Sequence, residues 1–162
     1  MRLSAIGRVG LKITTPEEIS AQVQTLVKKL EDKNSDIREK AIRALGMMAE
    51  NAKEAVPVLT EILLKDKDWY IRAISAWALG YIGGETVLPG LTEAGLKDKN
   101  EFVRWGAIEA IGRSGRTLQD IEVINTVLVK ALSSDENMYV WREAKNGLIQ
   151  LNKTKQHLHN IR

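Results

Sequence analysis

The chain contains no cysteine, only two histidines and three prolines, and these shortages exclude several classes of protein. Without cysteine it can form no disulfide bond, thiolate metal site or cysteine nucleophile. Both histidines, His157 and His159, lie near the C-terminal end, so catalysis centred on histidine has few candidates. With 12 glycines among 162 residues and 44% hydrophobic residues, the chain is neither collagenous nor linker-like, and we expect a single folded domain over residues 1–162.

The excess of positive charge lies at the two ends of the chain. The formal net charge is +3, from 24 Lys and Arg against 21 Asp and Glu. Residues 1–15 and 153–162 hold no acid and six bases, which are Arg2, Arg8, Lys12, Lys153, Lys155 and Arg162. Setting these six aside leaves 18 bases against 21 acids, so residues 16–152 carry a net charge of −3. This balance argues against a phosphate-binding body, because such binding depends on cations placed along the nucleic acid.

The sequence shows neither a membrane-spanning run nor a secretory signal. No apolar stretch approaches the ~20 residues that span a bilayer. The first residues, MRLSAIGRVG, lack the sustained apolar segment of a signal peptide. We therefore expect a cytoplasmic protein without a membrane partner.

One short segment recurs four times along the chain. The copies are residues 32–38 (DKNSDIR), 66–72 (DKDWYIR), 98–104 (DKNEFVR) and 135–141 (DENMYVW). Four positions after the Ile or Val of each copy stands a small residue, at Ala41, Ser75, Ala107 and Ala144. Four positions further on stands Leu or Ile, at Leu45, Leu79, Ile111 and Leu148. This spacing predicts one apolar helical stripe per copy.

Capping signals place the helix starts. The side chains of Asn34, Asp68, Asn100 and Asn137 are expected to accept hydrogen bonds from the first backbone N–H groups of the second helix in each copy. Thr15-Pro16-Glu-Glu18 predicts a capping box. We expect helices at residues 16–31, 35–49, 53–65, 69–82, 85–97, 101–113, 118–133 and 138–151, and no strands. Gly46, Gly80 and Gly112 fit either the end of the second helix or a close crossing of the next one.

The two ends of the chain differ from its body. Residues 5–10 (AIGRVG) repeat residues 110–115 (AIGRSG) almost letter for letter, which indicates a degenerate half-repeat over residues 1–15. Four repeats are then expected over residues 16–152. Residues 153–162 are expected to form a frayed basic tail.

These features resemble the HEAT-repeat family, and the resemblance covers about residues 16–152. The family pattern has an early proline in the first helix, an Asp between the helices and Val-Arg in the second, and Pro57, Pro89, Ile71-Arg72 and Val103-Arg104 match it. The first unit departs from the pattern by having no proline beyond Pro16, and the fourth has Trp141 in place of the Arg. The resemblance implies an all-α fold, a right-handed α-solenoid of about four helix pairs plus an N-terminal half-repeat. It also implies that the second helices line a concave surface that binds protein segments or other extended partners.

The repeated acids and bases have a structural interpretation. In HEAT-like stacks, Asp and Arg at these positions bond the backbone and each other between adjacent units. We assign this role to Asp32, Asp66, Asp98, Asp135, Arg38, Arg72 and Arg104. The segment Asp32–Asp36 lacks the glycine and the terminal Glu of a calcium loop, and Gly83-Gly84 lacks the strand and Lys-Ser/Thr of a phosphate-binding loop. We predict no metal, no cofactor and no catalytic residue.

Side chains that vary between units on the second helices are the candidate binding residues. Two, six and ten positions after the Ile or Val, they should point to the concave face. The candidates are Trp77, Tyr81, Trp105, Arg43, Glu109, Arg113 and Arg142. Aromatic and Arg side chains dominate binding hot spots. Trp77 and Trp105 could instead fill gaps between units, and we interpret a second row, Tyr70, Phe102 and Tyr139 with Trp69, as packing along one rim.

Three functional hypotheses follow. The first is a non-enzymatic scaffold that binds a protein segment in the concave groove. The second is nucleic-acid binding, as in DNA glycosylases that resemble this architecture, with Trp77 and Trp105 gripping a duplex and Glu109 as the one carboxylate placed for catalysis. The third is an accessory role similar to that of bilin lyases, some of which resemble short HEAT arrays, although neither a cysteine nor a buried histidine is present for a covalent step.

Overall fold

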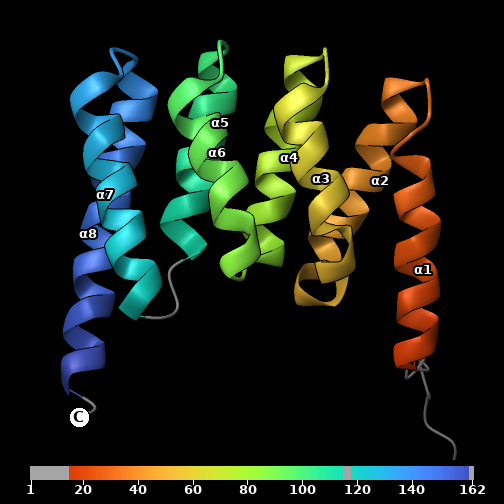
Figure 1. The fold of residues 1–162 in the computed structure, drawn as a ribbon, viewed down its shortest axis with the longest axis horizontal. Coiled ribbons are helices and arrows are strands. Elements are labelled where there is room, and N and C mark those ends of the chain that lie inside the picture. The colour runs from red at the N-terminus through yellow and green to blue at the C-terminus, as the bar shows by residue number, and fades with distance from the viewer. Residues whose placement is uncertain (1–14, 115–117, 161–162) are drawn as a thin grey trace, which may run out of the picture.

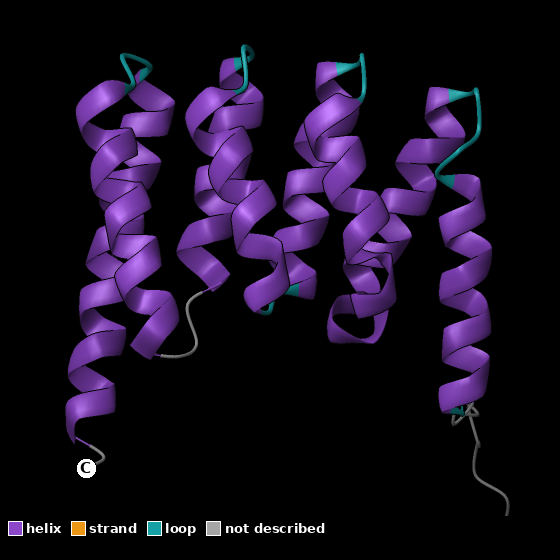
Figure 2. Ribbon diagram, in the orientation of Figure 1, coloured by secondary structure: helices purple, strands orange, loops and turns teal. Residues whose placement is uncertain are grey.

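The computed structural model describes residues 15–114 and 118–160, which form α-helices and short 3₁₀ segments without any strand (Figures 1 and 2). The helices are α1 (Pro16–Lys29), α2 (Ser35–Met48), α3 (Val56–Lys65), α4 (Trp69–Ile82), α5 (Leu88–Lys97), α6 (Glu101–Ser114), α7 (Leu118–Ser134) and α8 (Met138–Asn160). The 3₁₀ segments η1 (Ala49–Ala55) and η2 (Glu85–Val87) precede α3 and α5. The predicted all-α fold and the order of its helices are confirmed. Residues 1–14 of the predicted half-repeat lie outside the described residues.

The end of α8 differs from the prediction. The helix was expected to end at residue 151, but it continues to Asn160 through most of the segment predicted to be a frayed tail. Leu158 is half-buried and packs against the core. At 3.6 residues per turn, Leu158 lies about five turns after Val140 and therefore on the same face of the helix. Leu158 therefore continues the apolar face of α8 beyond residue 151.

The helix starts have the predicted caps. Thr15 Oγ1 accepts from the Glu18 N–H at 3.2 Å and a Glu18 carboxylate oxygen accepts from the Thr15 N–H at 3.0 Å, which completes the capping box. The four Asx side chains predicted as caps each accept from a backbone N–H two residues later, at 2.9 Å, in α2, α4, α6 and α8.

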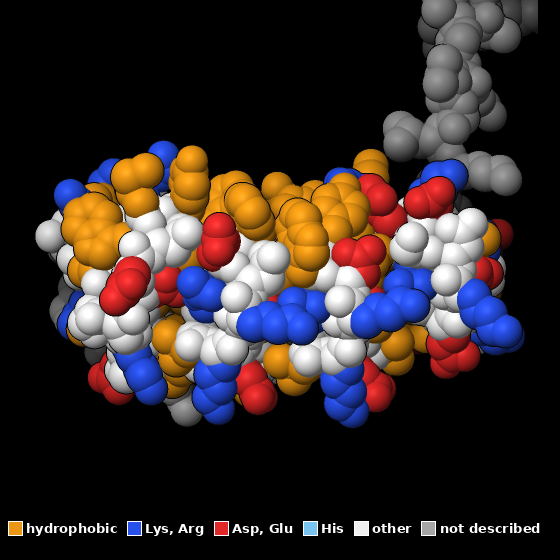
Figure 3. All heavy atoms as spheres, turned by 90° about the horizontal axis from the view of Figure 1, so that it is seen from above, with side chains coloured by type: hydrophobic (Ala, Val, Ile, Leu, Met, Phe, Trp, Pro, Cys, Tyr) orange, Lys and Arg blue, Asp and Glu red, His pale blue; other side chains and the backbone are white. Residues whose placement is uncertain are grey.

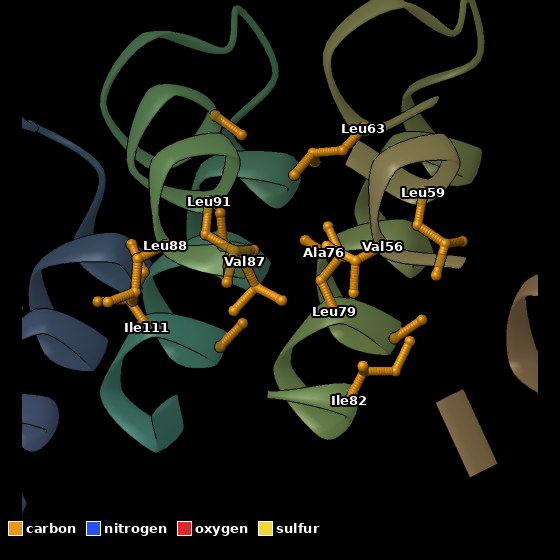
Figure 4. Packing of buried hydrophobic residues seen from close by; sticks show 14 of the residues in the cluster. Val56, Leu59, Leu63, Ala76, Leu79, Ile82, Val87, Leu88, Leu91 and Ile111 are labelled. Carbon is orange, nitrogen blue, oxygen red and sulfur yellow. The ribbon is translucent and has the colours of Figure 1, made fainter. Parts of the chain in front are cut away.

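The helices form two layers in a side-by-side stack of four pairs (Figure 1). In each pair the first helix lies in one layer and the second in the other, and the apolar side chains of both meet in a continuous core. Figure 4 shows part of this core in the second and third pairs, with Leu59 and Leu63 of α3, Leu79 of α4 and Leu91 of α5 among the buried side chains. The stack is therefore an α-solenoid in which each repeat buries its stripe against its neighbours. None of the described helices combines the length and apolar character needed to cross a membrane.

Glycines allow the second helices to approach one another closely. A Cβ built on Gly80 of α4 would lie 2.7 Å from the Cβ of Ala110 in α6, and one on Gly112 would lie 3.3 Å from the Cα of Gly147 in α8. These glycines therefore serve a close crossing, one of the two roles left open by the sequence. Successive second helices contact each other more extensively than successive first helices do. The more tightly spaced layer is the inner side of a curved stack, so α2, α4, α6 and α8 form the concave face.

Candidate binding surface

The loop between the two helices of each repeat is fixed by a recurring set of hydrogen bonds. In the third repeat, Asp98 Oδ1 accepts from the Asn100 N–H at 2.8 Å, and Arg104 Nη1 donates to the Asp98 carbonyl at 2.9 Å. Arg38 and Arg72 bond the carbonyls of Asp32 and Asp66 in the same way. The first residue of each recurring segment therefore shapes the turn, and in the first three repeats an Arg clamps that turn to the second helix.

The same arginines connect each repeat to the next. Arg72 donates from Nε and Nη2 to Asp98 at 2.8 and 2.9 Å, and Arg104 donates to Asp135 from Nε at 2.6 Å. The Arg38–Asp66 pair is longer, at 3.2 Å between Nε and Oδ2. We call this series of contacts between the repeated Arg and Asp side chains of neighbouring repeats the ladder.

Burial and pairing act in opposite directions on the ladder carboxylates. Burial by itself raises the pKa of Asp98, but hydrogen bonds from Arg72 and from the Asn100 backbone outweigh it and hold the pKa below its usual range. The pKa of Asp135 is lowered in the same way, because bonds from Arg104 and Asn137 outweigh its burial. Pairing thus stabilises the ionised forms of Asp98 and Asp135.

The ladder stops at each end of the described repeats. Trp141 occupies the Arg position in the fourth repeat, where it is exposed and Lys145 Nζ lies 5.2 Å from its ring centroid. Asp32, at the other end, accepts from its own loop at Asn34 and has no cationic partner within the described residues.

Three clusters of aromatic and arginine side chains lie along the concave face, and each bridges two neighbouring repeats. They are Glu39–Arg43–Tyr70, Trp77–Tyr81–Glu109–Arg113 and Trp105–Tyr139–Arg142. All seven predicted binding residues belong to these clusters, which lie on the layer of second helices, the central one nearer the C-terminal ends of α4 and α6 and the other two nearer the helix starts.

The central cluster joins α4 to α6. The Trp77 and Tyr81 ring centroids lie 4.6 Å apart within α4. The Arg113 guanidinium of α6 lies 4.8 Å above the Tyr81 ring, a cation–π contact, and Arg113 Nη1 lies 3.1 Å from the Glu109 carboxylate. Tyr81 remains 44% exposed, so one face of this aromatic and charged assembly is open to solvent.

The first cluster joins α2 to α4 through hydrogen bonds. Arg43 Nε donates to Glu39 at 2.8 Å and Arg43 Nη2 donates to the Tyr70 hydroxyl at 2.8 Å, while that hydroxyl donates to Glu39 at 3.0 Å. The hydrogen bond from Arg43 is the main cause that holds the pKa of Glu39 below its usual value. The Tyr70 ring is thereby fixed in place.

The third cluster joins α6 to α8. The Trp105 and Tyr139 ring centroids lie 6.4 Å apart, and the Arg142 guanidinium lies 5.3 Å from the Tyr139 ring centroid. No carboxylate pairs with Arg142 among the described residues, in contrast to Arg43 and Arg113. This cluster therefore presents a cation whose charge is not offset by a neighbouring acid.

The exposure of the aromatic side chains differs from what the sequence suggested. Trp77 and Trp105 are half-buried and pack against the core, and the Trp77 ring covers Gly46 of α2. They fill gaps between repeats and also contribute to the surface. The rim row of Tyr70, Phe102 and Tyr139 with Trp69, interpreted from the sequence as packing, is between 36% and 45% exposed.

A shallow pocket lies between α6 and α8 on the same face. Gly112 and Gly147 cross there without side chains, and the pocket is flanked by Glu109 and Arg113 on one side and by Asn146 and Gln150 on the other. The close crossing thus leaves a depression of mixed polar and apolar lining next to the central cluster.

Comparison with known proteins agrees with this architecture. The sequence profile described as HEAT repeats matches residues 3–74, 23–112 and 56–136. No curated protein matches the chain. Among solved structures, a chain in the complex of CpcE and CpcF of phycocyanin lyase from Nostoc sp. PCC7120 superposes with a TM-score of 0.62 at 24% identity, covering 87% of this chain and 86% of that chain. At that identity the similarity concerns the fold. The recurring segments, the stacked helix pairs and the profile that spans most of the sequence together show that this chain belongs to the HEAT-repeat family.

Proposed function

We propose that the chain is a non-enzymatic scaffold that binds a segment of a partner protein along its concave face. The observation that carries this proposal is the set of three clusters on one layer of the stack, each rooted in two repeats and each exposing aromatic surface next to an arginine. Rings held by neighbouring side chains lose little conformational entropy when a partner binds, and aromatic and Arg residues supply most of the energy at protein interfaces.

The charge on this face favours a protein partner over a nucleic acid. Arg43 and Arg113 each lie within 3.1 Å of a glutamate four residues earlier on the same helix, so their charges are largely offset. Neutralising a phosphate backbone requires cations that are not already compensated. Mixed charge beside aromatic rings is the composition of a protein-binding surface.

The scaffold proposal can be tested by selecting peptides from a displayed library against the folded chain and measuring the enriched peptides by fluorescence anisotropy. Tyr81→Ala should weaken their binding by about tenfold or more, as for a central aromatic contact. Because Tyr81 is exposed, the melting temperature should change little. Trp141→Ala is the matched control, since it removes an aromatic side chain of similar exposure from outside the three clusters. The proposal fails if no peptide is enriched, or if both variants bind equally well.

A second candidate is an accessory role in bilin chemistry, favoured by the fold similarity to a chain of phycocyanin lyase. An aromatic surface beside arginines suits a flat conjugated ligand that carries carboxylates. Titration of the chain with a free bilin, followed by absorbance, tests it directly. A saturable spectral change that Tyr81→Ala reduces would support this role, whereas an unchanged spectrum would remove it.

A further inference from the structure

We infer that the end of the stack formed by the first repeat docks the last repeat of another HEAT-type chain, one whose final second helix carries Arg, an apolar residue and Gly at intervals of four. The site is the end surface of the first repeat and not the concave face, so it is independent of the proposed function. Its chemistry follows from the three contacts that join the four repeats to one another.

Each of these contacts uses three residues of the earlier second helix, which lie four positions apart and therefore on one side of the helix. An Arg pairs with the ladder Asp of the next repeat, and a Gly eight positions later lets the next second helix approach. The residue midway between them is apolar and fully buried. We call these three positions the forward face, and its copies are Arg38, Ile42 and Gly46, then Arg72, Ala76 and Gly80, then Arg104, Ile108 and Gly112. Figure 3, which looks onto the loop end of the stack, shows Lys and Arg side chains recurring along its length.

The following repeat receives the forward face with two residues, which we call the rear face. One is the Asp at the start of the recurring segment, and the other is a small residue seven positions after the Ile or Val. A Cβ built on the three forward-face glycines would lie 3.1, 3.0 and 3.3 Å from the Cα atoms of these small residues, Ala78, Ala110 and Gly147. All three small residues are buried by this approach.

The first repeat has a complete rear face that is only partly covered. Asp32 Oδ1 accepts from the Asn34 N–H at 2.8 Å, as its three counterparts accept at 2.8 or 2.9 Å, so its carboxylate is held in the same way. No cation pairs with Asp32 in the part of the chain that the structure describes. Ala44 occupies the small-residue position and is half-buried, and so is Ile37, whereas their counterparts in the later repeats are buried. The surface that receives a preceding repeat is therefore present at this end.

The cation that completes Asp32 is an arginine belonging to a repeat of the same kind. In the ladder a single guanidinium serves two loops, as Arg72 does by donating to the carbonyl of Asp66 from Nη1 at 2.9 Å and to Asp98 from Nε at 2.8 Å. The compact ammonium of a lysine lacks the planar fork that makes both bonds. The partner therefore brings a loop and a second helix together, which a short basic peptide does not.

A second copy of this chain does not supply that partner. In the fourth repeat the forward-face positions hold Trp141, Lys145 and Ile149, all exposed. Trp141 offers no guanidinium to an Asp, and the side chain of Ile149 would occupy the space that the other repeats leave empty with glycine. Head-to-tail stacking of identical copies, which would grow into an open filament, is thus blocked at this end.

The test restores the missing forward face and looks for docking. A variant with Trp141→Arg, Lys145→Ile and Ile149→Gly copies the forward face of α6 onto α8, and Ala44→Leu in the same molecule closes its own rear face. Mixed with the wild-type chain, this variant should form a 1:1 complex in sedimentation-velocity ultracentrifugation. Asp32→Asn in the wild-type partner should weaken the complex by about tenfold or more, because the ladder pair is lost. Asp36→Asn, which neutralises an exposed acid close by in the sequence, is the matched control and should leave the complex unchanged.

A consensus HEAT-repeat protein ending in the same Arg, Ile and Gly replaces the variant if the variant does not unfold cooperatively. Absence of a complex with a folded probe, or a complex equally strong with Asp32→Asn, would overturn the inference. A complex that forms only after residues 2–13 are deleted would identify the chain's own N-terminal segment as the occupant of this surface. Self-association of the wild-type chain that Asp32→Asn abolishes would identify a second copy. Either result would overturn the assignment to another chain.

Discussion

Breaking the ladder between the second and third repeats should destabilise the whole stack. The Arg72 and Asp98 side chains are 5% and 9% exposed and are joined by two hydrogen bonds of 2.8 and 2.9 Å. Arg72 Nη1 also donates to the Asp66 carbonyl at 2.9 Å. Arg72→Ala removes all three bonds and leaves a buried carboxylate without its cation. Losing one partner of a buried pair costs about 3–5 kcal/mol, and we expect a loss in this range.

The matched control is Arg43→Ala, which removes an arginine of the preceding repeat whose side chain is 46% exposed. Exposed ion pairs contribute about 0–1 kcal/mol, so this variant should unfold near the wild-type denaturant concentration. The double variant Arg72→Ala with Asp98→Asn should lose less free energy of unfolding than its two single variants lose together. The substitution of Asp98 removes the unpaired charge, while the new amide oxygen can still accept the hydrogen bond from the Asn100 N–H.

The assay is urea unfolding followed by far-ultraviolet circular dichroism, with the free energy extrapolated to zero denaturant. A loss of less than about 1 kcal/mol for Arg72→Ala, indistinguishable from Arg43→Ala, would refute the reasoning that the ladder stabilises the contacts between repeats. Additive single and double variants would show that no coupling exists between the two side chains.

Other features of the fold lead to further predictions. Gly80→Ala places a Cβ 2.7 Å from that of Ala110 and should cost about 1–3 kcal/mol of stability. Gly106→Ala adds a Cβ that meets only a carbonyl oxygen at 3.6 Å, so it should stabilise the chain by about 0.5–1 kcal/mol. Melting temperatures of the two variants that move in the same direction would contradict this pair of predictions. Because folding lowers the pKa values of Asp98 and Asp135, their contribution to stability is complete above the unfolded pKa of about 3.9 and is lost as the pH falls through the folded pKa values. The urea concentration at the unfolding midpoint should therefore fall below about pH 4, and it should fall less in the double variant Arg72→Ala with Asp98→Asn. Equal pH profiles for the wild type and this double variant would rule out the ladder as the cause. Leu158→Ala removes a half-buried contact and should cost about 1 kcal/mol while speeding amide exchange over residues 153–160; unchanged exchange would mean that Leu158 does not hold this part of α8.

Much of the fold could be predicted because its determinants are local and repeated. The Asx caps and the apolar stripe recur in all four units and the ladder Arg in three of them, so an error at one copy is corrected by the others. The extension of α8 was missed because its one core contact in this segment, Leu158, stands apart from the stripe among polar residues. Periodicity detects a run of apolar residues far better than a single distant one.

The composition of the candidate surface could be predicted, but its exposure could not. Helical spacing placed Tyr81 and Arg113 on one face, and the structure brings them into contact. How far Trp77 is covered depends on Gly46 of the preceding repeat, which lets the indole settle onto α2. The exposure of Phe102 likewise depends on its neighbour Trp69 in the preceding repeat. Such contacts between repeats are not encoded in the spacing of either residue within its own helix.

The central claim is that the second-helix layer is the binding face. The most direct test is hydrogen–deuterium exchange of the chain with and without a saturating selected peptide. The account predicts slower exchange in α4, α6 and α8, centred on the segments that carry Tyr81, Phe102 and Tyr139, with little change in α3, α5 and α7. Protection confined to the first-helix layer would contradict it.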